Sequence, residues 1–240
     1  GKTKDDLDKL QVRVEAIADD MKTGEFSSDD VSQYIYAKHA KERNKVIFER
    51  TEGKVENGSG MSDAEADQIL NSYEGKKKEQ MEAISKKVQE IVADTRRTYV
   101  ELGLENQEAI DAFESMFENY VPLSGIAIDE ETAETSSYPT GGGGLAIYGS
   151  PTKRARGRKT QAQNILAQVV AQNAQAKVRG RKNEALNTLY NLVQDNPNSK
   201  VWRITDTVKY ESDNAVGIRV NGQQRYIVFR DASMAKSLKK

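Results

Sequence analysis

The sequence predicts a mainly α fold, a helical bundle of about six helices with a small antiparallel β-sheet, a hairpin, near the C-terminus. Through most of the chain, apolar residues recur at alternating spacings of three and four, the pattern of amphipathic helices. After residue 200 the spacing shortens to two, and Asn221-Gly222 separates two such runs, which is typical of a tight hairpin. Hydrophobic residues make up only 37% of the chain, but their periodicity argues against disorder.

The first two helices are expected in the first 50 residues. The first has an apolar stripe from Leu7 to Met21 and ends at Gly24. The second is capped by Ser27 or Ser28 and reaches about Phe48.

Local end signals predict three further helices. After the polar loop 51–60, Ser62 and Glu65 have the spacing of a capping box. A long helix is expected from about Lys76 to Leu102, with Gly103 at the position of a C′ glycine. Asn106 caps the next helix, and the following Pro122 prevents its continuation.

The second half begins with a long helix. A short strand is expected at Leu145–Tyr148, and a helix then runs from Thr160 to the Asn196-Pro197 stop. Gly180 inside this helix costs about 1 kcal/mol relative to Ala, so a break or kink is expected as one outcome there.

The C-terminal region is predicted to contain the sheet. Strand-like segments occur at Val201–Ile204 and Thr207–Tyr210, and the hairpin pairs residues 215–220 with residues 223–229. Trp202 is expected in the core of this sheet, and Asp231 caps a last short helix.

Composition divides the chain into three predicted parts. Residues 1–125 form an acidic helical subdomain, and residues 126–150 form a flexible acidic and Gly-rich loop. Residues 151–240 contain a basic long helix, the small sheet and the C-terminal helix. The four glycines at 141–144 are predicted to act as a hinge.

The two halves carry opposite charge. Residues 1–135 contain 31 Asp and Glu against 18 Lys and Arg, a net of −13, whereas residues 136–240 contain 6 against 18, a net of +12. The 49 residues between Glu134 and Glu184 contain no carboxylate side chain. Charge separation of this kind bears on partners rather than on fold.

Several function classes are disfavoured by composition. The absence of cysteine excludes disulfides and thiolate metal sites, and a single histidine disfavours a His-based zinc site or a Ser-His-Asp triad. No apolar run approaches the roughly 18 residues that span a bilayer. We therefore expect no catalytic residue, no cofactor, no metal site and no membrane span.

The candidate contact residues are basic. Five positive charges occur in the seven residues Lys153–Lys159, and a second cluster follows on the same predicted helix. One interpretation is a surface for phosphate groups or a partner protein, and the other is internal pairing with the acidic half. No aromatic residue interleaves with these charges, so base stacking is not indicated. The candidates are Lys153, Arg154, Arg156, Arg158, Lys159, Lys177, Arg179, Arg181 and Lys182.

Other polar groups have plainer interpretations. His39 lacks a nucleophile and an orienting partner in its helix, so a half-buried structural role is expected. The glycines at 141–144 are not followed by Lys-Ser or Lys-Thr, so they do not form a P-loop. The three adjacent carboxylates Asp129–Glu131 are expected to be solvated.

A set of motifs occurs in a shared order that resembles one family. The motifs are Tyr36-Ala37-Lys38-His39-Ala40-Lys41-Glu42-Arg43-Asn44, Gly58-Ser59-Gly60-Met61-Ser62-Asp63-Ala64-Glu65-Ala66, Asn119-Tyr120-Val121-Pro122-Leu123, the acidic loop, the basic run with its Ala/Gln/Asn helix, and the Val220-Asn221-Gly222 hairpin with its closing helix. Together, from about Val31 to Leu238, they resemble a large polyvalent protein-associated domain of phage and mobile-element proteins.

This resemblance implies a non-catalytic module of a much longer tailed-phage protein. Such proteins are carried in the virion interior and are delivered into the host cytoplasm with the DNA, so a role in assembly and delivery is expected. The partners implied are other virion proteins or further domains of the same chain, with DNA as a further candidate, in an oligomeric assembly. The alternative is a nucleic-acid-binding module that acts after delivery, and an enzyme is a third interpretation that no paired carboxylates support.

Overall fold

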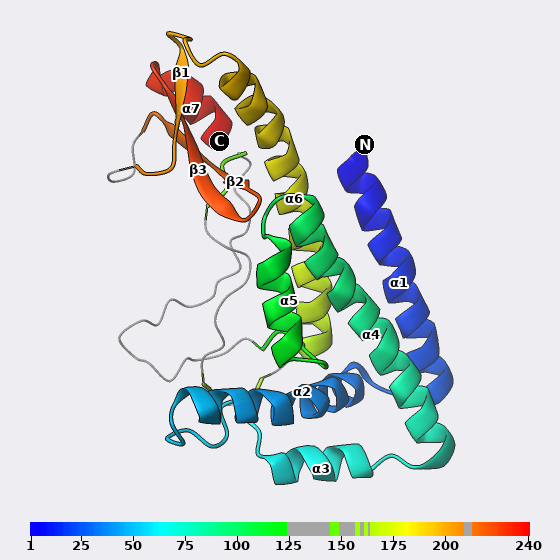
Figure 1. The fold of residues 1–240 in the computed structure, drawn as a ribbon. Helices are drawn as coiled ribbons and strands as arrows, with labels where there is room; N and C mark the ends of the chain where they lie inside the picture. The colour runs from blue at the N-terminus through cyan, green and yellow to red at the C-terminus, as the bar shows by residue number, and fades with distance from the viewer. Residues whose placement is uncertain (124–144, 149–156, 159–160, 163, 209–212) are drawn as a thin grey trace.

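The computed structural model describes residues 1–123, 145–148, 157–158, 161–162, 164–208 and 213–240. Within these residues the chain is mainly helical, with seven helices and a three-stranded antiparallel sheet near the C-terminus (Figure 1). The predicted fold class is confirmed. The helices are α1 (Lys2–Gly24), α2 (Ser28–Arg50), α3 (Asp63–Asn71), α4 (Gly75–Glu101), α5 (Gln107–Met116), α6 (Ile165–Asp195) and α7 (Ala232–Lys239). The strands are β1 (Trp202–Thr205), β2 (Ala215–Val220) and β3 (Gln223–Phe229).

The predicted helix caps are confirmed as hydrogen bonds. The Ser27 side chain accepts from the backbone N–H of Asp30, whose carboxylate accepts in return from the N–H of Ser27. Ser62 and Glu65 form the same reciprocal pair at the start of α3. Asn106 accepts from the N–H of Ala109 at the start of α5. These local bonds satisfy backbone donors that have no partner inside the helix.

The start of α6 differs from the sequence prediction. The helix begins at Ile165 because Asn164 has a left-handed backbone with φ of 53°, which cannot continue a helix; Thr160 lies outside the described residues. The helix is continuous through Gly180 to Asp195, which is one of the two outcomes predicted there. A Cβ at Gly180 would lie 2.5 Å from Cδ1 and 3.0 Å from Cβ of Leu102, so the glycine allows the end of α4 to approach closely.

We predict that Gly180→Ala destabilises the protein by about 1 kcal/mol. The better helix propensity of Ala contributes about 1 kcal/mol, but the added methyl group overlaps Leu102 and costs about 1–3 kcal/mol. In a Leu102→Ala background the same substitution should cost less or become stabilising, because the contact with Cδ1 is removed and only the contact with Cβ at 3.0 Å stays. Urea unfolding of the native protein, the two single variants and the double variant measures whether Gly180→Ala stabilises or destabilises in each background. A stabilising Gly180→Ala in the native background would contradict the packing role.

The hairpin forms as predicted. β2 and β3 pair antiparallel through Val220 and Gln223, and Asn221 and Gly222 both have positive φ (47° and 76°), as a type I′ turn requires. The sheet order is β1-β3-β2. Trp202 packs edge-to-face on Phe229, with ring centroids 6.3 Å apart.

One strand prediction was wrong, and a second fails at the two of its residues that the structure describes. Residues 145–148 form no strand, because Ile147 donates to Gly217 of β2 whereas Leu145 donates to Leu238 of α7, and a ladder needs successive bonds to one strand. Thr207 and Val208 likewise lie outside any strand, and residues 209–210 fall outside the described part.

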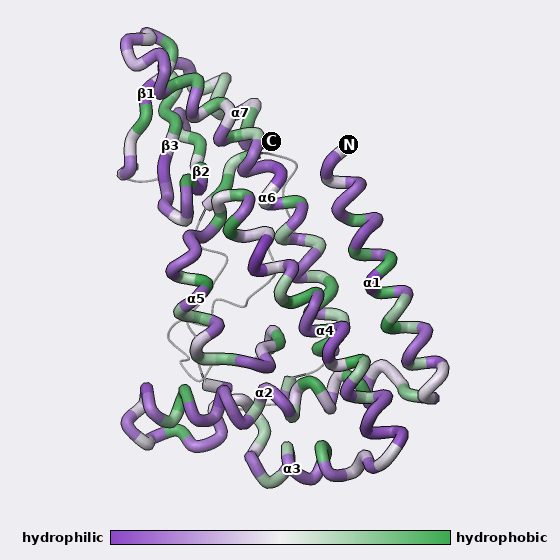
Figure 2. Tube along the Cα trace, turned by 45° about the vertical axis from the view of Figure 1, so that its right-hand side comes forward, coloured by the Kyte–Doolittle hydropathy of each residue, from purple (hydrophilic) through white to green (hydrophobic). Residues whose placement is uncertain are grey.

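α6 is the central helix of the molecule. It packs against α1, α2 and α4 and against β1 and β2 (Figure 1). Val169 near its start belongs to an apolar cluster with residues of α1 to α4, whereas Leu186 belongs to a second cluster with the end of α4, α5, the sheet and α7. In both views α2 and α3 lie at one end of this arrangement and the sheet lies at the other (Figure 2).

Candidate functional site

The described part of the basic stretch lies mostly along α6. Of the nine candidate residues, Lys153, Arg154, Arg156 and Lys159 fall outside the described residues, and Arg158, Lys177, Arg179, Arg181 and Lys182 are described. The contacts of the latter group decide which charges are directed into the molecule.

Lys177 is held inside the helix bundle by Asp94 of α4. Its Nζ atom lies 2.7 Å from Oδ2 of Asp94 and donates to Oγ1 of Thr98 at 2.7 Å. The side chains of Lys177 and Asp94 are only 12% and 16% exposed. Asp94 also accepts from Arg97 at 2.9 Å and from Nδ2 of Asn173 at 3.1 Å. The cation is therefore surrounded by its own protein.

The bonds to Asp94 stabilise its charged form. Burial alone would raise the pKa of Asp94, but hydrogen bonds from Lys177, Arg97 and Asn173 outweigh burial and hold the pKa at about 2, below the ordinary value of 3.8. A carboxylate of this kind stays ionised at any pH at which the protein is folded in a cell.

Arg181 joins α6 to α1. Its Nε lies 2.7 Å from Oδ2 of Asp6, its Nη2 donates to Oδ1 of the same carboxylate at 3.2 Å, and its Nη1 donates to Glu184 at 3.0 Å. The two-pronged geometry is the strong form of an arginine–carboxylate pair. The hydrogen bond from Arg181 lowers the pKa of Asp6. Lys2 of α1 adds a more exposed bridge to Glu184 at 3.0 Å.

The remaining candidates also have contacts within the protein. Arg179 donates through Nη2 to the backbone carbonyl of Tyr148 at 2.6 Å. Arg158 is only 6% exposed, and its backbone N–H donates to the carbonyl of Gly58 at 2.9 Å. Lys182 is half-buried on α6. Of the two interpretations, internal pairing thus describes Lys177 and Arg181, whereas the role of residues 153–156 and 159 stays a prediction.

The sequence reasoning missed the polar groups that position these charges. Asn173 is fully buried and donates to Oγ1 of Thr95 at 2.9 Å, and Asn183 is fully buried between α4 and β2. A signal was present: Val169, Asn173, Ala176, Gly180 and Asn183 follow one another at spacings of three and four. Such a stripe of small and amide residues is typical of a helix face that packs closely on a neighbour.

No protein-family model matches the chain, and no curated protein or solved structure is significantly similar to it. The resemblance to polyvalent-protein domains therefore remains a prediction from motifs. The glycines at 141–144 and the carboxylates at 129–131 lie outside the described residues. In the described ranges, no group of three His, Asp or Glu side chains is placed to hold a metal ion, and none of the helices is long and apolar enough to cross a membrane.

His39 is fully buried rather than half-buried as predicted. Residues 117–120, which follow α5, fold over α2, so that the imidazole meets the rings of Phe117 and Tyr120 edge-on at centroid distances of 5.2 Å and 5.3 Å. Neither ring nitrogen has a hydrogen-bond partner among the described residues, and Nδ1 lies 3.5 Å from Glu42. Glu42 instead accepts from the backbone N–H groups of Glu118 and Asn119.

We predict that stability falls as the pH drops below 6.5 because His39 resists protonation in the fold. Burial lowers its pKa, and the cations Arg43 and Arg96 act in the same direction, against Glu42. Since the unfolded chain binds a proton that the folded chain does not, unfolding becomes easier as pH falls. Between pH 6.5 and 5 the loss is at most about 2 kcal/mol.

The variant His39→Phe tests this directly, because His39 is the only histidine in the chain. Urea unfolding between pH 7.5 and 5 should show a flat profile for the variant and a falling profile for the native protein. Parallel profiles would show that His39 is not the titrating group.

Proposed function

We propose that the chain is a non-catalytic structural module of a large tailed-phage protein, carried in the virion interior and delivered into the host with the DNA, where it serves assembly and delivery. The observation that carries the structural part is the pairing of Lys177 with Asp94 and of Arg181 with Asp6. These bonds use cations of the basic helix to join α6 to α4 and α1. A helix whose charges are paired within its own bundle suits a structural part of a longer chain better than a phosphate-binding surface.

The viral part of the proposal is supported by the order of the sequence motifs. Two of them have clear structural roles. In the first, Tyr36 donates to the carbonyl of Ser59, and Asn44 donates to Met61 and accepts from the N–H of Ser59. The first motif thus holds the second, so the two form one structural unit between α2 and α3. Coupled motifs of this kind would be kept together in a module that is shared among large proteins.

Virion content tests the viral role. Particles of the phage that encodes the chain are purified and treated with protease, and their peptides are measured by mass spectrometry. We expect peptides of this chain to survive in intact particles and to be lost when the particles are opened first. Peptides that are abundant in infected cells but absent from particles would refute a virion role.

The rival role, nucleic-acid binding after delivery, has a separate test. Fluorescence anisotropy with a labelled DNA duplex should give only weak, non-specific binding, with a dissociation constant of about 10⁻⁴–10⁻⁶ M at physiological salt. The decisive variant replaces Arg154, Arg156 and Lys159 with Ala, and the matched control replaces the exposed Lys45, Lys76 and Lys86. Tight, salt-sensitive binding that only the first variant abolishes would favour the rival role.

A further inference from the structure

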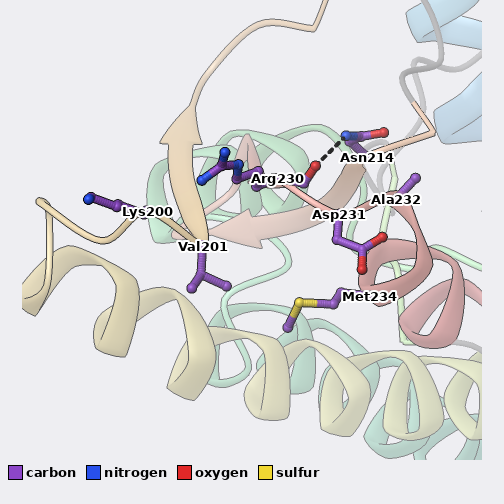
Figure 3. Close-up of a pocket in the computed structure, with 7 residues that line it drawn as sticks. All are labelled: Lys200, Val201, Asn214, Arg230, Asp231, Ala232 and Met234. Carbon is purple, nitrogen blue, oxygen red and sulfur yellow. Dashed lines mark hydrogen bonds between the residues drawn. The ribbon is translucent and has the colours of Figure 1, made fainter.

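A depression at the sheet end of the molecule combines exposed apolar side chains with charged ones. It has a volume of about 630 Å³ and lies between the start of β1 and the start of α7. Val201 and Met234, which are 42% and 40% exposed, point to the same side of it (Figure 3). Lys200 and Arg230 line it together with the carboxylate of Asp231, and no described residue forms an ion pair with either cation. Exposed apolar side chains beside charged ones are typical of a protein interaction surface.

The outward face of α1 has the complementary character. Val12 is 66% exposed, more than any other large apolar residue in the described part of the chain. At spacings of three and four it shares a stripe with Asp5, Asp8, Glu15 and Asp19. This stripe therefore presents one apolar side chain among four carboxylates, of which Asp8 is also paired with the exposed Lys4 at 2.6 Å.

The two surfaces cannot meet within one molecule. α1 packs on α4 and α6, whereas the depression belongs to the β1–α7 end of the sheet (Figure 1). The second view agrees that the N-terminal part of α1 stands apart from the sheet (Figure 2). The match of apolar centre and opposite charge is therefore available only between molecules.

We propose that the depression binds the outward stripe of α1 of a second copy of this chain, so that molecules associate head to tail. Val12 of one copy lies against Val201 and Met234 of the next, and Asp8 and Glu15, which flank Val12, face Lys200 and Arg230. Different surfaces on the two partners form a heterologous contact, which repeats into a ring or an open filament. Complementary charge sets the orientation of such a contact, and apolar burial supplies affinity. The contact is a property of the chain itself and holds whether or not the chain comes from a virion.

The test measures self-association by sedimentation velocity between about 5 and 500 µM of the chain, at low and at physiological salt. The depression variant carries Lys200→Glu and Arg230→Glu, and the stripe variant carries Asp8→Lys and Glu15→Lys. The native chain should associate, more weakly at higher salt, and each variant alone should associate at least tenfold more weakly. Val12→Ser should weaken association by roughly fivefold.

A mixture of the two variants tests whether these two surfaces bind each other. The depression variant has an acidic depression and the stripe variant has a basic stripe. These two surfaces attract each other, so an equimolar mixture should associate again. A control with Lys45→Glu and Lys54→Glu, two exposed lysines on α2 and in the loop that follows it, should behave like the native chain. Circular dichroism checks that every variant is folded. A native chain that stays monomeric to 500 µM, association that neither variant weakens, or a mixture that fails to associate would each overturn the proposal.

Discussion

Replacing Asn183 with Ala should lower the free energy of unfolding by about 3–5 kcal/mol. The amide is fully buried and joins three chain segments. Its Nδ2 donates to the carbonyls of Leu102 and Arg219, both at 2.8 Å, and its Oδ1 accepts from the N–H of Arg219 at 2.9 Å. Loss of the side chain leaves the N–H of Arg219 and the carbonyl of Leu102 buried without these partners, and each such group costs about 1–3 kcal/mol.

Two further variants separate hydrogen bonding from volume. Asn183→Asp keeps the size of the side chain but turns a donor into an acceptor against two carbonyl oxygens, so it should destabilise at least as strongly as Ala. Asn191→Ala, on the exposed side of α6, is the matched control and should change stability by less than about 0.5 kcal/mol. Urea unfolding followed by circular dichroism gives all three values. A cost below 1 kcal/mol for Asn183→Ala would show that this amide is not an important link between the sheet and the helices.

Features that depend on near neighbours in sequence were predictable. The caps at Ser27, Ser62 and Asn106 join atoms three residues apart, and the Asn221-Gly222 turn needs only its own backbone angles. The start of α6 was not predictable in this way, because the left-handed Asn164 interrupts a segment whose apolar spacing still looks helical. The local sequence thus predicts that a segment is helical, but it does not predict where α6 begins.

The sequence predicted that opposite charges could pair inside the protein, but not which residues would pair. Opposite charge in the two halves indicated internal pairing as one outcome, and Arg181 and Asp6 do pair, although they are 175 residues apart in the chain. Which cation meets which carboxylate depends on the packing of α1 and α4 on α6, and no local pattern encodes that. The stripe that contains Asn173 and Asn183 indicates a closely packed helix face, but it does not identify their partners, which lie on α4 and β2.

The substitution Lys177→Met should cost about 2–3 kcal/mol at pH 7. Methionine keeps the apolar stem but removes the charge, and leaves the mostly buried Asp94 with only Arg97 and Asn173. Removing one partner of a fully buried ion pair costs about 3–5 kcal/mol, and the remaining bonds and partial exposure reduce that value here. The exposed Lys86→Met on α4 is the control and should be nearly neutral.

The same pair predicts a change in acid stability. Because the pKa of Asp94 is about 2 in the fold and 3.8 in the unfolded chain, its contribution is complete above pH 3.8 and is lost as pH falls through 2. Without Lys177 the folded pKa rises, so Lys177→Met should lose less stability than the native protein on acidification below pH 4. The double variant with Asp94→Asn should recover part of the lost stability, because no carboxylate is then left buried. If the cycle instead shows no coupling between residues 94 and 177, Lys177 is not a structural cation, and its charge becomes available to a phosphate or a partner protein.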